Sequence, residues 1–448
     1  MRLVISVAEA KRMEKLLGSV QIPEIIADDV KKSVKSIMGF GEKIKEYISQ
    51  NTTNLLDVVL CGAVIIGSSD IHIEPEKEKV KLRTRIDGVL QDVALLEHDI
   101  YHNLLSRIKL LSKIKLNITD KPQDGRFTIS IKNLLVEIRT SSLPAEFGES
   151  IVMRVLNPEN FLALETLGLR KDLYKILEKE IKRPNGMVII TGPTGAGKTT
   201  TLYAFLTKIK SPGIKIITIE DPIEYHISGI SQTQAAPEKG YSFSEGLKSI
   251  VRQDPDVILV GEIRDLETAK IALQASLTGH LVLTTLHTND AAGTIPRLVD
   301  LGASPKSIAP AIKIVIAQRL VRRVCKKCSF LIKPSKQELV EIKKGLKGVP
   351  KEIIGIKDFS RIKIAKANER GCSICNHTGY FGRKGLFEVF LTDAEVEKFI
   401  LTDPPTSSIK EKAIKKGMVT IYQSGLIEVV LGQTTLQEVK KVVGEEAR

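Results

Sequence analysis

The sequence predicts an α/β protein in which a parallel sheet carries helices on both faces and a smaller mixed domain precedes it. The chain has 448 residues, which is enough for two or three domains with buried cores. Its 42% hydrophobic and 27% charged residues are typical of a folded globular protein. Between residues 187 and 286, short apolar strands alternate with helical stretches. This alternation indicates a parallel sheet that is covered on both sides.

The first part of the chain divides into a segment, a domain and a connecting helix. Residues 1–50 are rich in Lys and Glu and have a helical pattern. Residues 51–160 mix strands and helices, as an α+β domain does. Residues 161–183 are expected to form a linker helix, because Pro184-Asn185-Gly186 follows them and breaks a helix.

Short-range patterns predict individual elements inside residues 51–160. The apolar run Val58–Gly67 indicates a buried helix segment. Val80–Ile86 alternates apolar and basic residues, so we expect a half-exposed strand, with Asp87-Gly88 as its turn. Asp124-Gly125 predicts a second turn, between two short strands.

The predicted parallel sheet belongs to a second domain that spans residues 184–448. Its expected strands are Met187–Thr191, Ile214–Ile219, Val257–Val260 and Leu281–Leu286. Beyond Leu320 the pattern becomes helical and lysine-rich, and pairs of cysteines interrupt it. We therefore expect a cysteine-bearing insertion at 321–385, followed by C-terminal helices.

Charge and hydropathy restrict the classes of partner. Lys and Arg exceed Asp and Glu by 14, which favours nucleotide phosphates, nucleic acid or an anionic membrane surface. There is no Trp and only 4% of residues are aromatic, so the stacking platforms of single-strand binders are poorly supplied. No apolar run approaches the ~20 residues that span a bilayer, and the N-terminus lacks the pattern of a signal peptide. We expect a cytoplasmic protein.

A glycine-rich turn predicts a phosphate-binding loop. Residues 192–199 read GPTGAGKT, which satisfies G-x-x-x-x-G-K-[ST], and they lie between an expected strand and an expected helix. The glycines let backbone N–H groups point at a phosphate, and the helix directs its positive end at the same charge. Lys198 is expected on the β- and γ-phosphates of ATP, and the Thr199 hydroxyl on Mg²⁺. The candidate nucleotide-binding residues are Gly192, Pro193, Thr194, Gly195, Ala196, Gly197, Lys198, Thr199 and Thr200.

Acidic residues follow two of the apolar strands. Val257–Val260 leads to Glu262, as in a Walker B strand, and Ile219 is followed by the acidic segment Glu220–Glu224. Hydrolysis needs an acid at the Mg²⁺ and a carboxylate that orients water. His280 and His287 flank a third strand, where they act either on a phosphate or as structural residues.

Four of the five cysteines form two C-x-x-C pairs, Cys325/Cys328 and Cys372/Cys375. This pairing predicts a structural zinc site with four thiolates, which leaves no position for water. Two redox motifs are the alternative, but no thioredoxin-like pattern surrounds either pair. Cys61 stands alone in an apolar run and is expected in the core.

The order of these motifs resembles the secretion ATPase superfamily, specifically the type II secretion and type IV pilus assembly motors. The likeness runs from about Leu55 to the C-terminus. Beside the loop, the acidic segments and the histidines, it includes Ser69–Pro75, Arg85–Leu90, Gln123–Arg126, Gly148–Ser150, Arg252–Asp256 and Gly379–Arg383.

This resemblance implies a RecA-like P-loop ATPase domain preceded by a PAS-like α+β domain. It implies that Glu224 activates water, that Glu262 is the Walker B acid, and that His280 and His287 belong to a histidine box. Family members are six-membered rings in which arginines of the N-terminal domain reach the nucleotide. The candidates are Arg83, Arg85, Arg107 and Arg126, of which we single out Arg85 and Arg126. Assembly motors also carry the zinc site, which the retraction branch lacks.

The implied function is a homohexameric motor that hydrolyses ATP with Mg²⁺ and drives a platform protein of the inner membrane. The chain would sit at the inner face of the cytoplasmic membrane through its partners and would not bind nucleic acid. Only about fifty residues precede the resembling region, so docking through a further N-terminal domain is not expected.

Three alternatives stay open on the sequence. The motor could serve type II secretion rather than a pilus, since both branches share these motifs. A nucleic-acid-translocating P-loop ATPase also agrees with the basic composition, and it predicts stimulation by DNA or RNA with steep salt dependence. The intact set of acids argues against a nucleotide-gated interaction protein that does not hydrolyse ATP.

Overall fold

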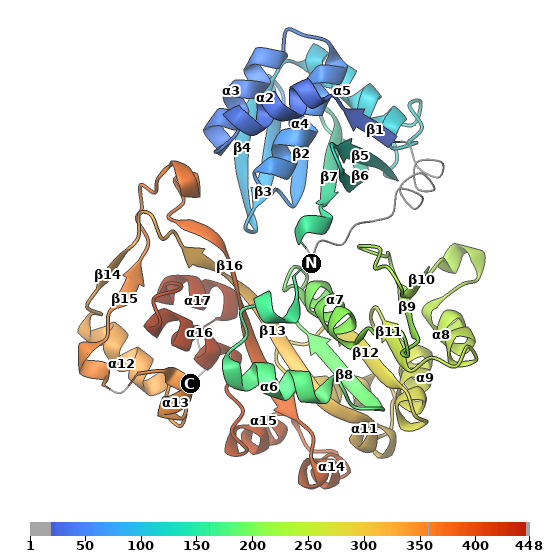
Figure 1. The fold of residues 1–448 in the computed structure, drawn as a ribbon, viewed down its shortest axis with the longest axis vertical. Coiled ribbons are helices and arrows are strands. Elements are labelled where there is room, and N and C mark those ends of the chain that lie inside the picture. The colour runs from blue at the N-terminus through green and yellow to red at the C-terminus, as the bar shows by residue number, and fades with distance from the viewer. Residues whose placement is uncertain (1–18, 161, 357, 445–448) are drawn as a thin grey trace. The chain divides into compact units, whose positions relative to one another are not determined.

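A computed structural model describes residues 19–160, 162–356 and 358–444 (Figure 1). The first eighteen residues of the predicted N-terminal helical segment lie outside this range. Contacts divide the chain into two compact units. Of the described residues, the first unit contains 19–160, Cys325–Cys328 and Asn368–Phe381, and the second contains the others.

The first unit contains a seven-stranded sheet in the order β1-β5-β6-β7-β2-β3-β4. Its strands are antiparallel neighbours, except that β1 and β5 run parallel. The strands are β1 (Ser19–Ile22), β2 (Asp70–Pro75), β3 (Val80–Ile86), β4 (Val89–Leu96), β5 (Gln123–Ile131), β6 (Leu134–Ala145) and β7 (Gly148–Leu156). The predicted strand Val80–Ile86 is β3, and Asp87 and Gly88 both have positive φ in the turn that follows it.

Among the described residues, this unit also contains the α-helices α2 (Glu24–Ser33), α3 (Ile37–Tyr47), α4 (Thr52–Ile65) and α5 (His98–Leu111). Helix α4 contacts each of the other three. Every side chain from Leu55 to Val64 is buried, which explains why the sequence there has no polar face. Asn51 caps the helix by accepting a hydrogen bond from the Asn54 N–H at 2.8 Å.

Two expectations for this half of the chain differ from the structure. Asp124-Gly125 is not a turn but part of β5, where Gly125 pairs with Thr140. A Cβ on Gly125 would lie 2.2 Å from the Ser112 carbonyl oxygen, so the glycine serves a close backbone approach. The expected linker helix is shorter than residues 161–183: α6 covers only Lys171–Glu180, and Gly168, with φ of +73°, interrupts the segment before it.

The second unit contains a seven-stranded sheet in the order β10-β9-β11-β12-β8-β13-β16. The first six strands of this order are parallel neighbours. The strands are β8 (Gly186–Thr191), β9 (Ile216–Glu220), β10 (Ser231–Gln234), β11 (Val257–Val260), β12 (Leu281–Leu286), β13 (Ile312–Val324) and β16 (Tyr380–Leu391). The four predicted strands are β8, β9, β11 and β12.

Helices cover both faces of this sheet, as the apolar strands predict. Alternate residues of β8 enter different cores: Met187 and Ile189 pack on one face, Val188 and Ile190 on the other. The first face is covered by α8 (Phe243–Val251), α9 (Leu266–Leu277), α10 (Thr294–Asp300) and α11 (Pro305–Ala311). The second is covered by α6 and α7 (Lys198–Ile209). A fold of the α/β class is therefore confirmed.

The C-terminal part contains more strand than the lysine-rich pattern predicts. The long strands β13 and β16 complete the sheet, because the Ile- and Val-rich start of β13 is buried beside β8. A small hairpin joins β14 (Phe330–Ile332) to β15 (Ile364–Lys366). The remaining helices are α12 (Lys336–Gly345), α13 (Lys351–Ile354), α14 (Ala394–Ile400), α15 (Thr406–Lys415), α16 (Ile421–Val430) and α17 (Leu436–Val443). Within the described residues, no helix combines the length and apolar character needed to cross a membrane.

Candidate nucleotide site and cysteine cluster

The glycine-rich loop connects β8 to α7 at the carboxyl edge of the parallel sheet. Gly192, Gly195 and Gly197 have φ of +150°, +77° and +86°, a backbone that side chains rarely adopt. A Cβ on Gly192 would lie 2.5 Å from the Gln318 carbonyl oxygen. Pro193, Thr194 and Gly195 are exposed at the tip. The loop thus presents backbone N–H groups at the positive end of a twelve-residue helix, the arrangement that binds phosphate.

Lys198 extends back over this loop. Its Nζ donates to the Gly192 carbonyl oxygen at 2.7 Å and to that of Pro193 at 3.2 Å. Burial lowers the pKa of Lys198, and the positive charge of Arg319 acts in the same direction, whereas Glu262 opposes both. The ammonium group is therefore poorly solvated beside a row of backbone dipoles. Such a group is suited to an anionic partner.

Some of the acidic and imidazole side chains predicted at this edge of the sheet lie close together. Strands β11 and β12 are parallel neighbours, so Glu262 and His287 follow adjacent carboxyl ends. His287 Nε2 lies 3.4 Å from the Glu262 carboxylate, and Arg264 forms an ion pair with the same carboxylate. Arg264 also lies 3.9 Å from Asp221, which follows β9. Glu262, His287 and the acidic segment are thus linked side by side.

The three acids after Ile219 have different surroundings. Glu220 is 3% exposed, ends β9, and accepts a hydrogen bond from Thr218 Oγ1 at 2.5 Å. Asp221 is exposed and Glu224 is partly exposed. The backbone N–H of Glu224 donates to the Tyr203 hydroxyl at 3.2 Å. Glu220 is therefore an internal group, while Asp221 and Glu224 have access to solvent.

His280 and His287 lie at opposite ends of β12. The six-residue strand between them spans roughly 20 Å. His280 Nδ1 is 3.0 Å from the Ala275 carbonyl oxygen, at the edge away from the glycine-rich loop. Only His287 is placed beside the loop and Glu262, so the two histidines cannot contact one phosphate within one chain.

The candidate arginines lie in the first unit, where Arg83 and Arg85 pair with acidic side chains. Arg83 binds Asp92 at 2.7 Å and Glu74 at 3.2 Å. Arg85 lies 3.6 Å from Asp70 and donates to the Gly88 carbonyl oxygen. Arg126 is an exposed residue of β5. Arg107, on α5, has a buried Nε without a hydrogen-bond partner.

Three residues of this edge do not belong to the sequence-predicted set. Thr191 Oγ1 is 2.7 Å from Thr288 Oγ1 and accepts the Thr288 N–H at 2.8 Å, which ties the end of β8 to the loop after β12. Gln318 accepts from Thr201 of α7 at 2.8 Å. Arg319 donates to the Asn289 carbonyl oxygen at 2.8 Å. The available signal was the polar pair Gln318-Arg319 within an otherwise apolar stretch.

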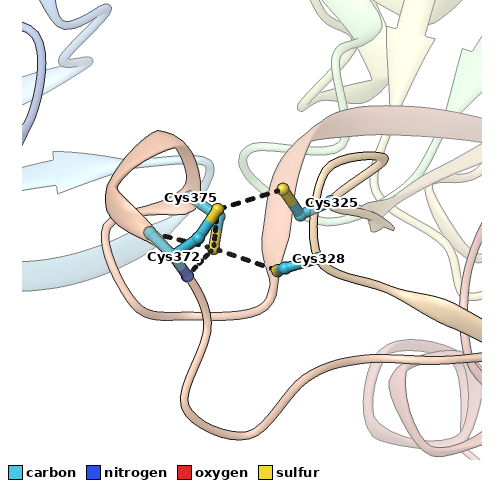
Figure 2. A group of neighbouring side chains, drawn as sticks. All are labelled: Cys325, Cys328, Cys372 and Cys375. Atoms are coloured by element: carbon cyan, nitrogen blue, oxygen red, sulfur yellow. Dashed lines mark hydrogen bonds between the residues drawn. The ribbon is translucent and has the colours of Figure 1, made fainter.

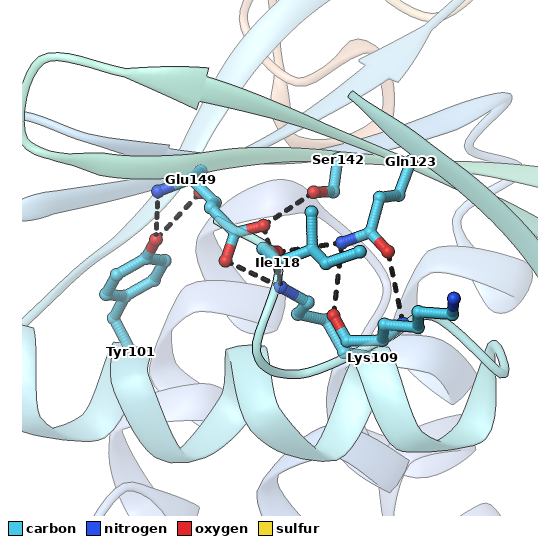
Figure 3. A network of polar contacts seen from close by, with 7 residues as sticks. Tyr101, Lys109, Ile118, Gln123, Ser142 and Glu149 are labelled. Carbon is cyan, nitrogen blue, oxygen red and sulfur yellow. Dashed lines mark hydrogen bonds and ion pairs between the residues drawn. The ribbon is translucent and has the colours of Figure 1, made fainter. Parts of the chain in front are cut away.

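The two cysteine pairs come together, as predicted. Sγ of Cys325 is 3.8 Å from that of Cys372, and Cys375 lies 3.8 Å from both Cys328 and Cys372 (Figure 2). All four sulfurs lie within 4.8 Å of one another. The backbone N–H groups of Cys372 and Gly379 point at Cys375 Sγ, at 3.1 and 3.3 Å. The first and last of the four residues, Cys325 and Cys375, are buried.

This geometry fits a tetrahedral zinc ion. Sulfurs that each lie about 2.3 Å from one zinc are about 3.8 Å apart, which matches the printed separations. Backbone N–H groups, that of Cys375 first, lower the pKa of the Cys372 thiol to about 7, which favours the thiolate. Since the chain supplies all four donors, the cluster is suited to a structural ion and leaves no position for water.

Comparisons with known proteins match this chain over most of its length. The chain is 39% identical over 435 residues to the type IV pilus assembly ATPase PilB of Thermus thermophilus, a match that covers 96% of this chain and 47% of that protein. It is 41% identical over 392 residues to the type II secretion system ATPase E of Vibrio cholerae, covering 87% and 75%. This chain thus spans about half the length of the first relative. The names of both agree with the predicted ATPase.

Solved structures share the fold. The Legionella pneumophila ATPase DotB superposes with a TM-score of 0.63 at 22% identity, covering 88% of this chain and 96% of that one. The pilus retraction motor PilT with bound ADP gives 0.57 at 25% identity, covering 85% and 94%. A family model described as type II/IV secretion system protein matches residues 47–441. The predicted resemblance is confirmed: the chain belongs to the type II/IV secretion system protein family.

Proposed function

We propose that this protein hydrolyses ATP with Mg²⁺ and uses the energy to drive assembly of a type IV pilus or a type II secretion pseudopilus. The single observation that carries the proposal is the juxtaposition, at one sheet edge, of the loop Gly192–Thr199 with Glu262 and His287. The loop binds phosphate, and the acid and imidazole supply the polar groups that hydrolysis needs. The names of the two relatives support the choice of machinery.

Each residue of this edge receives a role from its position. Lys198, held over the loop by backbone carbonyls, would bind the β- and γ-phosphates. Thr199 and Glu262 would hold Mg²⁺, which neutralises phosphate charge when it is bound. Glu224, partly exposed after β9, would orient the attacking water. His287 lies against the Glu262 carboxylate, where it can hydrogen-bond a phosphate oxygen or water.

The proposed motor function requires more than one chain. We propose a homohexamer in which Arg85 and Arg126 of one chain reach the nucleotide of a neighbour. An arginine placed in this way stabilises transition-state charge and makes hydrolysis depend on the neighbour. A nucleotide that contacts two domains favours one angle between them. Binding and hydrolysis can therefore move one domain relative to the other, which is how such a protein does mechanical work. The partner would be a platform protein of the inner membrane, at whose cytoplasmic face the ring would work.

The cysteine cluster would hold a structural zinc ion. It joins the strand end at Cys325 to the segment before β16, which are 47 residues apart in the chain. Closing such a loop contributes local folding energy. No chemistry is assigned to the ion, because the four thiolates fill its coordination sphere.

The test of the ATPase is Lys198→Ala. Loss of the ammonium group should abolish ATP hydrolysis, measured as phosphate release, because the phosphate charge loses its main partner. The matched control is Lys208→Ala, on the same helix, where an ion pair with Glu165 is lost instead. That control should keep normal turnover. Near-normal hydrolysis by Lys198→Ala would contradict the assignment of the loop.

A further inference from the structure

The hydroxyl of Tyr203 lies between the phosphate-loop helix and the acidic segment after β9. Tyr203 is on α7, five positions after Lys198, and it is 1% exposed. Its hydroxyl donates to the carboxylate of Glu220. It also accepts the backbone N–H of Glu224 at 3.2 Å. One side chain thus joins the helix that carries Lys198 and Thr199 to the backbone of Glu224.

The direction of these bonds is fixed by chemistry. A tyrosine hydroxyl has one proton, and a backbone N–H can only donate, so the proton of Tyr203 goes to Glu220. Burial, followed by the negative charge of Glu220, raises the pKa of Tyr203, so the hydroxyl keeps its proton. Glu220 is held in turn by Thr218 Oγ1 and by Gln232 Nε2, at 2.5 and 3.2 Å.

The same segment is held from its other side by β10. Gln232 donates to the carbonyl oxygen of Tyr225 at 3.0 Å and accepts the N–H of Ile227 at 2.7 Å. The rings of Tyr203 and Tyr225 pack edge to face, with centroids 6.2 Å apart. The backbone around Glu224 is therefore fixed by hydrogen bonds and by an aromatic contact. Tyr203 is the part of this arrangement that comes from the phosphate-loop helix.

We infer that Tyr203 is a positioning residue that sets the backbone of Glu224 relative to the phosphate loop. The inference rests on the proposed role of Glu224 in orienting water. Catalytic groups need to be held within about 0.5 Å of their working position, and a displacement of about 1 Å can cost ~100-fold in rate. A bond from α7 to the Glu224 N–H fixes this distance without touching the nucleotide.

The first experiment compares Tyr203→Phe with Thr218→Val in steady-state ATP hydrolysis. Tyr203→Phe keeps the ring but loses the bonds to Glu220 and to the Glu224 N–H. We expect kcat to fall by about 10-fold or more, with KM for ATP within about twofold, because binding uses the loop rather than Glu224. Thr218→Val also removes one donor to Glu220 but keeps the link from Tyr203 to Glu224. It should retain kcat within about twofold.

If Tyr203→Phe does not fold because Glu220 loses a donor, the double variant Tyr203→Phe/Glu220→Gln removes the buried charge as well. It should show the same fall in kcat. Wild-type kcat in a folded Tyr203→Phe or in this double variant would overturn the inference. An equal fall in Thr218→Val would also overturn it, because the effect would then come from Glu220.

A second comparison separates this inference from the proposed function. If Tyr203 acts through Glu224, single-turnover hydrolysis by Glu224→Gln should not fall further when Tyr203→Phe is added. If the double variant loses rate by the product of the two single losses, Tyr203 acts elsewhere. The inference would then be wrong while the role of Glu224 stood. Normal hydrolysis by Glu224→Gln would instead overturn the role of Glu224, and the inference about Tyr203 with it.

Discussion

Buried carboxylates illustrate how single side chains hold this protein together and where they cost stability. Glu388 is 1% exposed, and its two oxygens accept the N–H groups of Ala291 and Ile421 at 2.8 and 2.9 Å. It thereby connects the loop after β12 to the start of α16. Burial raises its pKa even so, because these two hydrogen bonds only partly replace water.

Asp57 in α4 provides a residue-scale prediction about pH. It is 3% exposed, and burial raises its pKa from 3.8 to about 6, against the opposing charge of Arg107. Because the folded pKa is the higher one, the stability contribution of Asp57 is full below about pH 4 and is lost as pH rises through 6. The difference in free energy of unfolding between Asp57→Asn and the wild type should therefore shift in favour of the variant, by at most about 3 kcal/mol, as the pH rises from 4 to 7.5. Urea unfolding at both values measures this gain, and a difference independent of pH would contradict it.

Other single residues show what the sequence could and could not predict. The position of Lys198 between a strand and a helix could be predicted, because both elements are local features of the sequence. Tyr203 could not be recognised, since its partner lies 21 positions away in the chain. For Gln318 the only signal was its polar pair with Arg319, because its own partner lies 117 positions away. The pair Asp124-Gly125 is typical of a turn, but the small size of Gly125 serves a close approach to the Ser112 carbonyl oxygen.

At the scale of elements, apolar strands were predictable and mixed ones were not. Strands β8, β11 and β12 are buried along their whole length, and their sequences are mainly apolar, with threonine as their one polar residue type. Strand β16 has exposed or partly exposed residues through Gly385 and is buried only from Leu386 to Phe390, and its sequence does not reveal it. Likewise, β1 has only four residues, and its pairing with β5 depends on a partner 109 positions away.

The proposed zinc ion makes the local stability of the cysteine cluster depend on bound metal. Elemental analysis of the purified protein should find about one zinc per chain, and chelation should expose Cys325, Cys328, Cys372 and Cys375 to alkylation. The reason is that a structural zinc site contributes its binding energy to local folding. Cys61 is the internal control, because it is fully buried in α4 and should stay unreactive in the native protein.

Nucleotide affinity should change little on chelation, since the glycine-rich loop lies on β8 and α7 and shares no residue with the cluster. Two results together would contradict the zinc assignment: no bound metal, and alkylation of all four cysteines in the untreated native protein.

At the scale of the whole molecule, the two units carry different candidate residues. The second unit carries the phosphate loop and the acidic edge. The first unit carries Arg85, which has Asp70 as an acidic neighbour, and Arg126, which is exposed on a strand. The order of motifs predicted the family, because each motif is local. It could not predict which arginine meets a nucleotide, because that depends on how separate bodies assemble.

Mixing two variants, each nearly inactive alone, shows whether ATP hydrolysis depends on arginines from a neighbouring chain. One chain carries Arg85→Ala and Arg126→Ala, and the other carries Lys198→Ala. A mixed ring places intact arginines of one chain beside an intact phosphate loop of another, so ATP hydrolysis should partly return when subunits exchange. Loss of such an arginine can lower the rate of phosphoryl transfer ~10³-fold, so a partial return of the hydrolysis rate can be measured easily. If the subunits exchange and hydrolysis stays at the level of the separate variants, the arginines do not act between chains. The proposal of a nucleotide site shared by two chains is then wrong.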